Sequence, residues 1–305
     1  MGIKKLQVEL GKIILETPII MASGTFGYGL EEINFIDYKK IGAITTKTIT
    51  YYPWEGNPQP RIYETYSGMI NNIGLQNPGV FYFIKNILPE IRKRFKKIFV
   101  SISGRTENEF IEIVKIMNKE KIDALELNLS CPNFEKKQKM ISQSSELTYK
   151  IVKKIKNETS IPLIAKLSPN VTDIKEIAIA AEEAGVDIIS VINTVKGLSV
   201  DLKKKKIIDG GLSGGCIKPI GLKSVYDIYK VVNIPIIGIG GIIKGTDAIE
   251  YFLVGASAIG IGSGLFTNSK IIDEVVESLI DFLNQTNKKN LKEITGLLNE
   301  KQRNN

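Results

Sequence analysis

The segment PIIGIGGIIKGTDAIEYFLVGASAIGIGSG, residues 235–264, decides the fold class. It begins and ends with a short isoleucine-rich run, and apolar residues recur at helical spacing between the two runs. Each run is apolar on both faces that a strand would have, which is typical of strands buried in a parallel sheet. The segment therefore predicts a strand–helix–strand unit with glycine-rich turns where its strands end.

The same alternation extends along most of the chain. Several segments between the apolar runs have the i, i+3, i+4, i+7 spacing of amphipathic helices. Eight strand-then-helix units in this length predict a (β/α)8 TIM barrel; a doubly wound open sheet, which usually has fewer strands, is the alternative. The expected strands are residues 18–23, 43–48, 98–103, 124–130, 163–168, 188–193, 235–241 and 258–264.

We expect residues 1–305 to form a single domain with a β-hairpin, residues 6–17, before the first strand. Three connections are too long for a bare strand-to-helix link, and all three leave the C-terminal ends of strands, where barrel enzymes build their sites. The sequence LKEITGLLNE near the C-terminus predicts a short amphipathic helix. The three long connections are residues 51–79, 131–145 and 194–219.

The composition excludes several classes of site. The chain has no histidine, which excludes a Ser-His-Asp triad, a Cys–His pair and an HExxH zinc site. Its two cysteines, Cys131 and Cys216, are too few for a disulfide framework or a cysteine-based metal site, so we expect no bound metal. The N-terminus lacks the features of a signal peptide, and residues 251–269, the longest uncharged stretch, contain four glycines. We therefore expect a cytoplasmic protein without a membrane partner.

The net charge of +8 raises the possibility of a nucleic-acid partner. The only dense basic cluster, Lys203–Lys206, has no aromatic residues among its lysines. Charge alone indicates solubility and steering rather than specific binding, so a solvated lysine-rich surface is favoured. A non-catalytic basic barrel that binds nucleic acid is kept as the remote alternative.

Polar or glycine residues end almost every expected strand. Lys47 and Lys166 each follow an apolar strand, and a buried ammonium group needs an anion or several acceptors. The last two strands end in GIGGI and GIGSG, where backbone N–H groups can approach a phosphate. These features predict a phosphorylated cofactor such as FMN, with Lys166 beside the N1–C2=O edge of the flavin. The other strand ends are Ser23, Ser101 with Ser103, Asn128 and Asn193.

Cys131 opens the polar loop that follows the fourth expected strand. In a chain without histidine it is a candidate base if its thiol pKa is lowered; the alternative is a small buried side chain. Several asparagines are expected at the same face, and their amides suit a planar ring that bears alternating C=O and N–H groups, such as a pyrimidine. These asparagines are Asn71, Asn72, Asn77, Asn128, Asn133 and Asn193.

The sequence resembles the class 1 dihydroorotate dehydrogenases from about residue 5 to residue 285. The combination of SCPN, residues 130–133, with NTVKGL, residues 193–198, is highly specific. The cysteine marks class 1, because the membrane-linked class 2 enzymes carry serine as the base. The motifs, in chain order, are MASGTFGYG, TTKTIT, NNIGLQNPG, ELNLSCPN, AKLSPNV, VINTVKG, GGLSGGCIKP, GIGGI and IGIGSGLF.

The resemblance implies oxidation of (S)-dihydroorotate to orotate on FMN, in de novo pyrimidine (UMP) biosynthesis. NTVKGLSVD followed by GGLSG is similar to the NAD-linked type, whose FMN-containing catalytic subunit pairs with an electron-transfer subunit carrying FAD and a 2Fe–2S cluster. A homodimer within a heterotetramer is then expected. The enzyme alternatives are a fumarate-linked class 1 enzyme and another flavin barrel that oxidises dihydropyrimidines.

The resemblance also implies residue roles. Cys131 would take the proton from C5 of dihydroorotate while a hydride leaves C6 for flavin N5, and Lys47 would touch both flavin and substrate. Two departures are noted: Ser101 stands where the family usually has an asparagine that touches the flavin, and the loop after Cys131 lacks its usual glycines. The expected FMN ligands are Ser23, Lys47, Thr48, Asn128, Lys166, Ile192, Gly214, Gly240, Gly241, Gly262 and Ser263. The expected substrate ligands are Lys47, Asn71, Asn72, Ile73, Gly74, Leu75, Asn128, Asn193 and Thr194.

Overall fold

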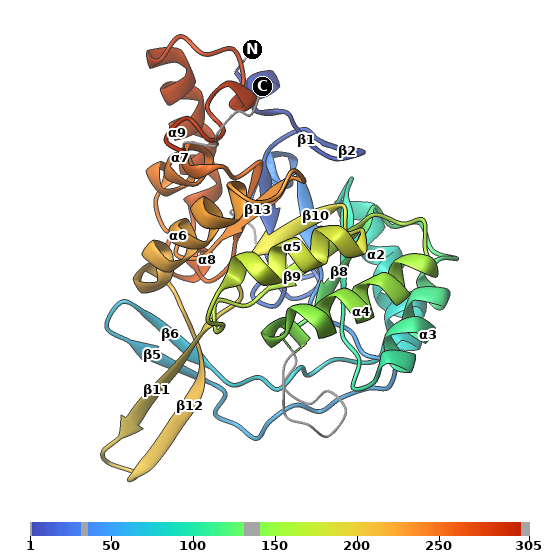
Figure 1. Cartoon of the computed structure of the whole chain (residues 1–305). Helices are drawn as coiled ribbons and strands as arrows, with labels where there is room; N and C mark the ends of the chain where they lie inside the picture. The colour runs from blue at the N-terminus through green and yellow to red at the C-terminus, as the bar shows by residue number, and fades with distance from the viewer. Residues whose placement is uncertain (1, 32–35, 131–140, 300–305) are drawn as a thin grey trace.

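The computed structural model describes residues 2–31, 36–130 and 141–299. Eight parallel strands pair in chain order, and the last pairs with the first, so that they close a barrel with helices around its outside (Figure 1). The predicted TIM barrel is therefore confirmed. Its strands are β3 (Ile19–Met21), β4 (Ala43–Thr45), β7 (Ile98–Ile102), β8 (Ala124–Asn128), β9 (Leu163–Leu167), β10 (Ile188–Val191), β13 (Ile236–Ile239) and β14 (Ala258–Ile261).

The barrel strands are buried on both faces, as their sequences predict. All five residues of β7 and of β9 are buried, because one face of each strand fills the barrel and the other packs against the helices. The helices are α1 (Val80–Tyr82), α2 (Leu88–Arg94), α3 (Glu107–Met117), α4 (Ser145–Asn157), α5 (Ile174–Ala184), α6 (Lys218–Tyr229), α7 (Gly245–Val254), α8 (Gly264–Thr267) and α9 (Ile271–Gln285). A π-helical turn, Phe83–Ile87, joins α1 to α2, and 3-10 turns lie at Ile3–Leu6, Tyr38–Lys40, Ile141–Gln143, Gly215–Ile217 and Leu291–Glu293.

Side-chain caps fix where several of these helices begin. The hydroxyl groups of Thr106 and Ser144 accept hydrogen bonds from backbone N–H groups in the first turns of α3 and α4, and the Asp173 carboxylate does the same for α5. Such caps satisfy N–H groups that have no partner inside the helix. None of the helices in the described ranges has the length and apolarity needed to span a membrane.

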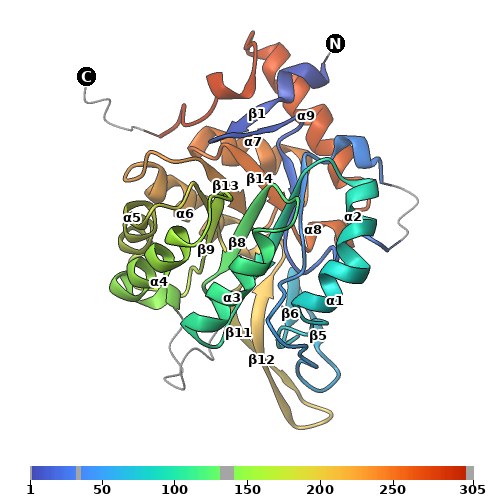
Figure 2. The same cartoon turned by 90° about the vertical axis from the view of Figure 1, so that its right-hand side faces the viewer.

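The expected N-terminal hairpin forms from β1 (Val8–Leu10) and β2 (Ile13–Leu15), which pair antiparallel. Leu10 and Leu15 are buried against the core, while Glu9 and Ile14 alternate outward. Figures 1 and 2 show this hairpin at the end of the barrel opposite to the antiparallel sheet described next. The strand-end face is therefore left free for a site.

Two of the three long connections form an antiparallel sheet that was not predicted from the sequence. Its strands pair in the order β11–β12–β6–β5. Glycine in β12 permits this pairing, because a Cβ atom on Gly210 would meet the backbone of Asn71 in β6, and one on Gly211 would meet Thr194. The strands are β5 (Ile62–Thr65), β6 (Gly68–Asn71), β11 (Val195–Asp201) and β12 (Lys206–Ser213). The third long connection lies largely outside the described residues.

The prediction of an amphipathic helix from LKEITGLLNE was wrong. Helical geometry there is limited to the 3-10 turn Leu291–Glu293. The chain then turns at Gly296, whose φ of +75° suits glycine, and the Gly296 and Leu298 N–H groups donate to carbonyls of Phe252 and Leu253 in α7. Docking onto α7 therefore replaces helix formation in this segment.

Candidate active site

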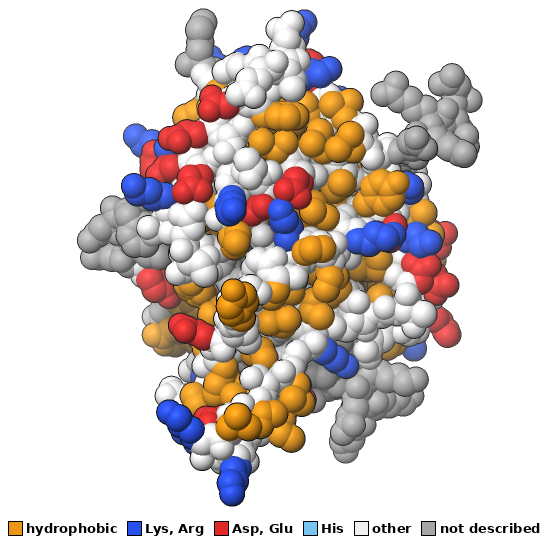
Figure 3. Space-filling model, turned by 90° about the vertical axis from the view of Figure 1, so that its left-hand side faces the viewer, with side chains coloured by type: hydrophobic (Ala, Val, Ile, Leu, Met, Phe, Trp, Pro, Cys, Tyr) orange, Lys and Arg blue, Asp and Glu red, His pale blue; other side chains and the backbone are white. Residues whose placement is uncertain are grey.

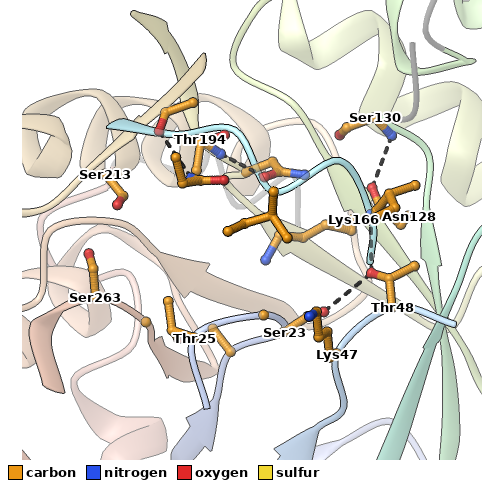
Figure 4. A pocket seen from close by; sticks show the side chains of 18 of the residues that line it. Ser23, Thr25, Lys47, Thr48, Asn128, Ser130, Lys166, Thr194, Ser213 and Ser263 are labelled. Carbon is orange, nitrogen blue, oxygen red and sulfur yellow. Dashed lines mark hydrogen bonds between the residues drawn. The ribbon is translucent and has the colours of Figure 1, made fainter. Parts of the chain in front are cut away.

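A cavity of about 1260 Å³ lies where the barrel strands end (Figure 4). Residues at or just beyond the ends of all eight barrel strands line it, and residues of β6, β11 and β12 contribute to its wall from the antiparallel sheet. Single small-molecule sites typically enclose about 300 to 1,000 Å³, so this cavity has room for a cofactor and a small substrate together.

The cavity brings together nearly all the predicted site residues. Cys131 lies outside the described residues, although Ser130 before it lines the cavity. Ser101 is fully buried behind the cavity wall and is absent from its lining. The predicted residues that line the cavity are Ser23, Lys47, Thr48, Asn71, Asn72, Ile73, Gly74, Leu75, Asn128, Lys166, Ile192, Asn193, Thr194, Gly214, Gly240, Gly241, Gly262 and Ser263.

Lys166 enters the cavity from β9, and its side chain points into the open space between the strand ends (Figure 4). It is only 6% exposed and makes no ion pair or hydrogen bond within the described part of the chain. Burial lowers the pKa of its ammonium group, while the nearby carboxylate of Glu126 acts in the opposite direction. A cation placed in this way attracts an anionic or electron-rich ligand.

Lys47 lies just beyond β4 on the same cavity wall. Burial lowers the pKa of its ammonium group, the positive charge of Arg61 lowers it further, and Glu31 opposes both. Arg61 itself donates to the backbone carbonyls of Asn57 and Glu55 and to Oε1 of Gln76 at 2.6 Å. Because these acceptors are neutral, the Arg61 charge adds to that of Lys47 at this side of the cavity.

Thr48 connects three strand ends through its hydroxyl group. Its Oγ1 lies 2.9 Å from Oγ of Ser101, accepts from Nδ2 of Asn128 at 3.2 Å and lies 3.4 Å from Oγ of Ser23. The Asn128 Oδ1 in turn accepts from the backbone N–H of Ser130 at 3.3 Å. These contacts hold the ends of β3, β4 and β8 in one geometry (Figure 4). The contact with Ser101 also joins them to β7.

Three glycine-rich turns present unpaired backbone donors to the cavity. The N–H groups of Gly214, Gly241, Gly262 and Ser263 make no hydrogen bond with the described residues. Gly240 and Gly241 have φ angles of +130° and +67°, a region that glycine reaches without strain. Converging backbone N–H groups form an anion-binding concavity. Free backbone donors are therefore present where the sequence predicts that a phosphate binds.

Buried polar atoms around the cavity also lack partners. These atoms make no hydrogen bond with any described residue, and such groups are normally satisfied by a ligand or water. A polar ligand with several donors and acceptors, such as a flavin or a pyrimidine, fits this lining. The atoms are Thr25 Oγ1, Tyr28 OH, Ser103 Oγ, Glu126 Oε1 and Ser130 Oγ.

Comparison with known proteins identifies the family. The family model for dihydroorotate dehydrogenase matches residues 5–283. A relative from Caldicellulosiruptor saccharolyticus, named "Dihydroorotate dehydrogenase B (NAD(+)), catalytic subunit", is 45% identical and covers 96% of this chain and 99% of its own length. The chain belongs to the dihydroorotate dehydrogenase family. The relatives of the same name from Alkaliphilus metalliredigens and Bacteroides thetaiotaomicron are each 43% identical and cover 96% of this chain and 98% of their own.

Membership of the dihydroorotate dehydrogenase family also accounts for the fold. The crystal structure of DHODH in complex with ferulenol from Eimeria tenella matches this chain with a TM-score of 0.81 at 25% sequence identity. The match covers 96% of this chain and 88% of that one. The resemblance found in the sequence motifs is therefore confirmed.

Several residues of this dihydroorotate dehydrogenase cavity were not predicted from the sequence. Glu126 is a charged residue inside the apolar run ALELN, a signal that was available in the sequence, and it is 2% exposed beside Lys166. The Arg105 guanidinium stacks 3.8 Å from the centre of the Trp54 ring, and both residues line the cavity. Asn170 donates to the Thr194 carbonyl at 3.0 Å. The contacts of Arg105 and Asn170 join segments distant in sequence and have no local signature.

Replacing Thr48 with Val is expected to lower the free energy of unfolding of the apoprotein by about 1 to 3 kcal/mol, because Ser101 and Asn128 lose a buried partner. Urea unfolding followed by circular dichroism measures the loss. If the hydroxyl groups form one network, Thr48→Val combined with Ser101→Ala costs less than the sum of the single changes. Strictly additive losses would contradict the network.

Proposed function

We propose that this chain oxidises dihydroorotate to orotate with FMN and passes the electrons through a partner subunit to NAD. The observation that carries this proposal is the joint placement of Lys47, Lys166 and the unpaired N–H groups of the glycine turns in one cavity. The names of the relatives, which specify a catalytic subunit and NAD(+), support the acceptor. The whole chain is proposed to act as one FMN-binding domain.

The residues fit FMN in three parts. Gly214, Gly241, Gly262 and Ser263 supply donors for the phosphate. Polar side chains come from Ser23, Thr48 and Asn128. Ile192 supplies apolar surface and Gly240 supplies backbone surface. Lys166 supplies a positive charge for the flavin ring. When bound, FMN supplies a two-electron acceptor for the hydride of the substrate.

Lys166 stabilises negative charge on its ligand because it is buried and has no ion-pair partner among the described residues. Lys47, supported by the charge of Arg61, binds the carboxylate of dihydroorotate. The pyrimidine ring is enclosed by amide and backbone groups. These groups come from the segment Asn71–Leu75 and from Asn193 and Thr194. The Asn71 side chain donates to the Gly211 carbonyl at 3.0 Å, which fixes the direction of its amide oxygen.

Cys131 is proposed as the base that removes the C5 proton. It follows Ser130, which lines the cavity, and the chain contains no histidine that could take this role. A thiolate near lysine ammonium groups is stabilised by their charge, which favours the form that accepts a proton.

The proposed assembly is a homodimer within a heterotetramer, with an electron-transfer subunit that carries FAD and a 2Fe–2S cluster, located in the cytoplasm. The hairpin of β11 and β12 projects from the barrel (Figures 1 and 2) and exposes Leu198, Val200 and Ile207 on one face. Figure 3 shows hydrophobic side chains gathered over this projection. Exposed apolar patches of this kind support a subunit contact.

The visible spectrum of the purified protein, recorded anaerobically before and after addition of L-dihydroorotate, tests the function. A yellow protein whose flavin absorbance bleaches on this addition is expected. Reoxidation by NAD in the presence of the electron-transfer subunit, and not by fumarate, is then expected. A flavin that stays oxidised would overturn the substrate, and a colourless protein that FMN cannot reconstitute would overturn the cofactor.

A further inference from the structure

Helix α7 supports the turn that follows β13 on the side away from the cavity. We propose that Tyr251 in this helix is a positioning residue for the phosphate of the flavin. Tyr251 acts through the Gly240–Gly241 turn and does not line the cavity itself. This inference rests on the proposed function, because it takes FMN as the ligand.

Tyr251 is a fully buried side chain whose hydroxyl donates to the Gly240 carbonyl at 2.6 Å. Two glycines leave the space that it occupies. A Cβ atom on Gly221 in α6 would meet the Tyr251 hydroxyl, and one on Gly238 in β13 would meet its ring. Two elements, α6 and β13, therefore leave space for the side chain that makes this hydrogen bond, which makes incidental packing of the ring a poor explanation.

Asp247 lies one turn before Tyr251 on α7 and holds the other end of the same turn. Its Oδ2 accepts from the backbone N–H groups of Ile243 at 2.9 Å and Lys244 at 2.8 Å. Its Oδ1 accepts from Nζ of Lys218 at 2.7 Å. Since Asp247 and Tyr251 are four residues apart, they share one face of α7. That face fixes both ends of the segment from Gly240 to Lys244.

Tyr251 and Asp247 bind the turn on either side of the Gly241 N–H group. Among the described residues this N–H group has no hydrogen-bond partner, and Gly241 lines the cavity. Both Gly240 and Gly241 have positive φ angles, and glycine has more backbone conformations to lose than any other residue. A turn of this composition binds an anion tightly only if its geometry is fixed before the ligand arrives. Tyr251 and Asp247 fix that geometry in advance.

The test compares Tyr251→Phe with the unchanged protein in binding FMN and riboflavin, which lacks the phosphate. Apoprotein is titrated with each flavin and the quenching of flavin fluorescence is followed. We expect Tyr251→Phe to weaken FMN binding by about 3- to 10-fold, the effect of one hydrogen bond, and to leave riboflavin binding unchanged. Tyr226→Phe is the matched control, because the Tyr226 hydroxyl accepts from Lys230 on the exposed side of α6; it should change neither affinity.

Equal weakening for both flavins, or unchanged FMN affinity, would overturn the positioning role. Asp247→Ala, which removes the acceptor of both turn N–H groups, is the second variant, and it should show the same selective loss for FMN even if Tyr251→Phe fails to fold. Failure of the unchanged protein to bind FMN would instead overturn the proposed function, and this inference with it. The two failures are therefore distinguishable.

Discussion

Replacing Cys131 with Ala is expected to lower kcat at pH 7 by about 10²- to 10⁴-fold, the usual contribution of a general base. The physical reason is that removal of a carbon-bound proton needs a base of suitable pKa, and a chain without histidine has few groups that can supply one. FMN binding should be unchanged, because the proposed FMN ligands remain in place. Anaerobic stopped-flow measurement of flavin reduction by dihydroorotate isolates this step.

Cys216→Ala is the matched control for this change. Cys216 is the other cysteine of the chain, lies near the Ser213 carbonyl and does not line the cavity. Its removal should leave the rate of flavin reduction unchanged. If Cys131→Ala reduced the flavin at the normal rate, another group would be the base, and Lys47 with its lowered pKa would be the next candidate.

Replacing Lys47 with Met is expected to lower kcat/KM for dihydroorotate by about 10²- to 10³-fold, similar to the loss of one fixed donor in other enzyme sites. Lys47 supplies the positive charge that we propose to hold the substrate carboxylate. Lys12→Met in the exposed turn of the N-terminal hairpin removes the same net charge at the opposite end of the barrel and controls for long-range electrostatics. Equal effects of the two changes would contradict a direct role for Lys47.

The pH dependence gives a second test of Lys47. Burial lowers the pKa of its ammonium group below the ordinary lysine value, and the charge of Arg61 lowers it further. The cation is therefore present below this lowered pKa and is lost as the pH rises through it. Affinity for orotate, measured by flavin difference spectra, should fall on the alkaline side before pH 10.5. In Lys47→Arg the guanidinium stays charged, so any affinity it retains should not show this fall.

The barrel and much of the site composition were predictable because their signals are local. A buried parallel strand is recognisable from its own apolar residues, and each of the eight runs carried that pattern. Closure of a parallel barrel places the C-terminal ends of all its strands at the same end of the barrel. Residues separated by more than a hundred positions, such as Lys47 and Lys166, could therefore be placed together from the strand pattern alone.

The tertiary structure alone decided how the long connections pair and how the site is supported. The antiparallel sheet joins β6 to β12, and the Asn71 side chain donates to Gly211, 140 residues further along the chain. The support of the Gly240–Gly241 turn by Tyr251 likewise depends on space left at Gly221. Such contacts have no sequence period, because they depend on which surfaces meet after the barrel has closed. Local patterns thus determined the barrel and its polar strand ends, while contacts between distant segments determined the wall and the backing of the cavity.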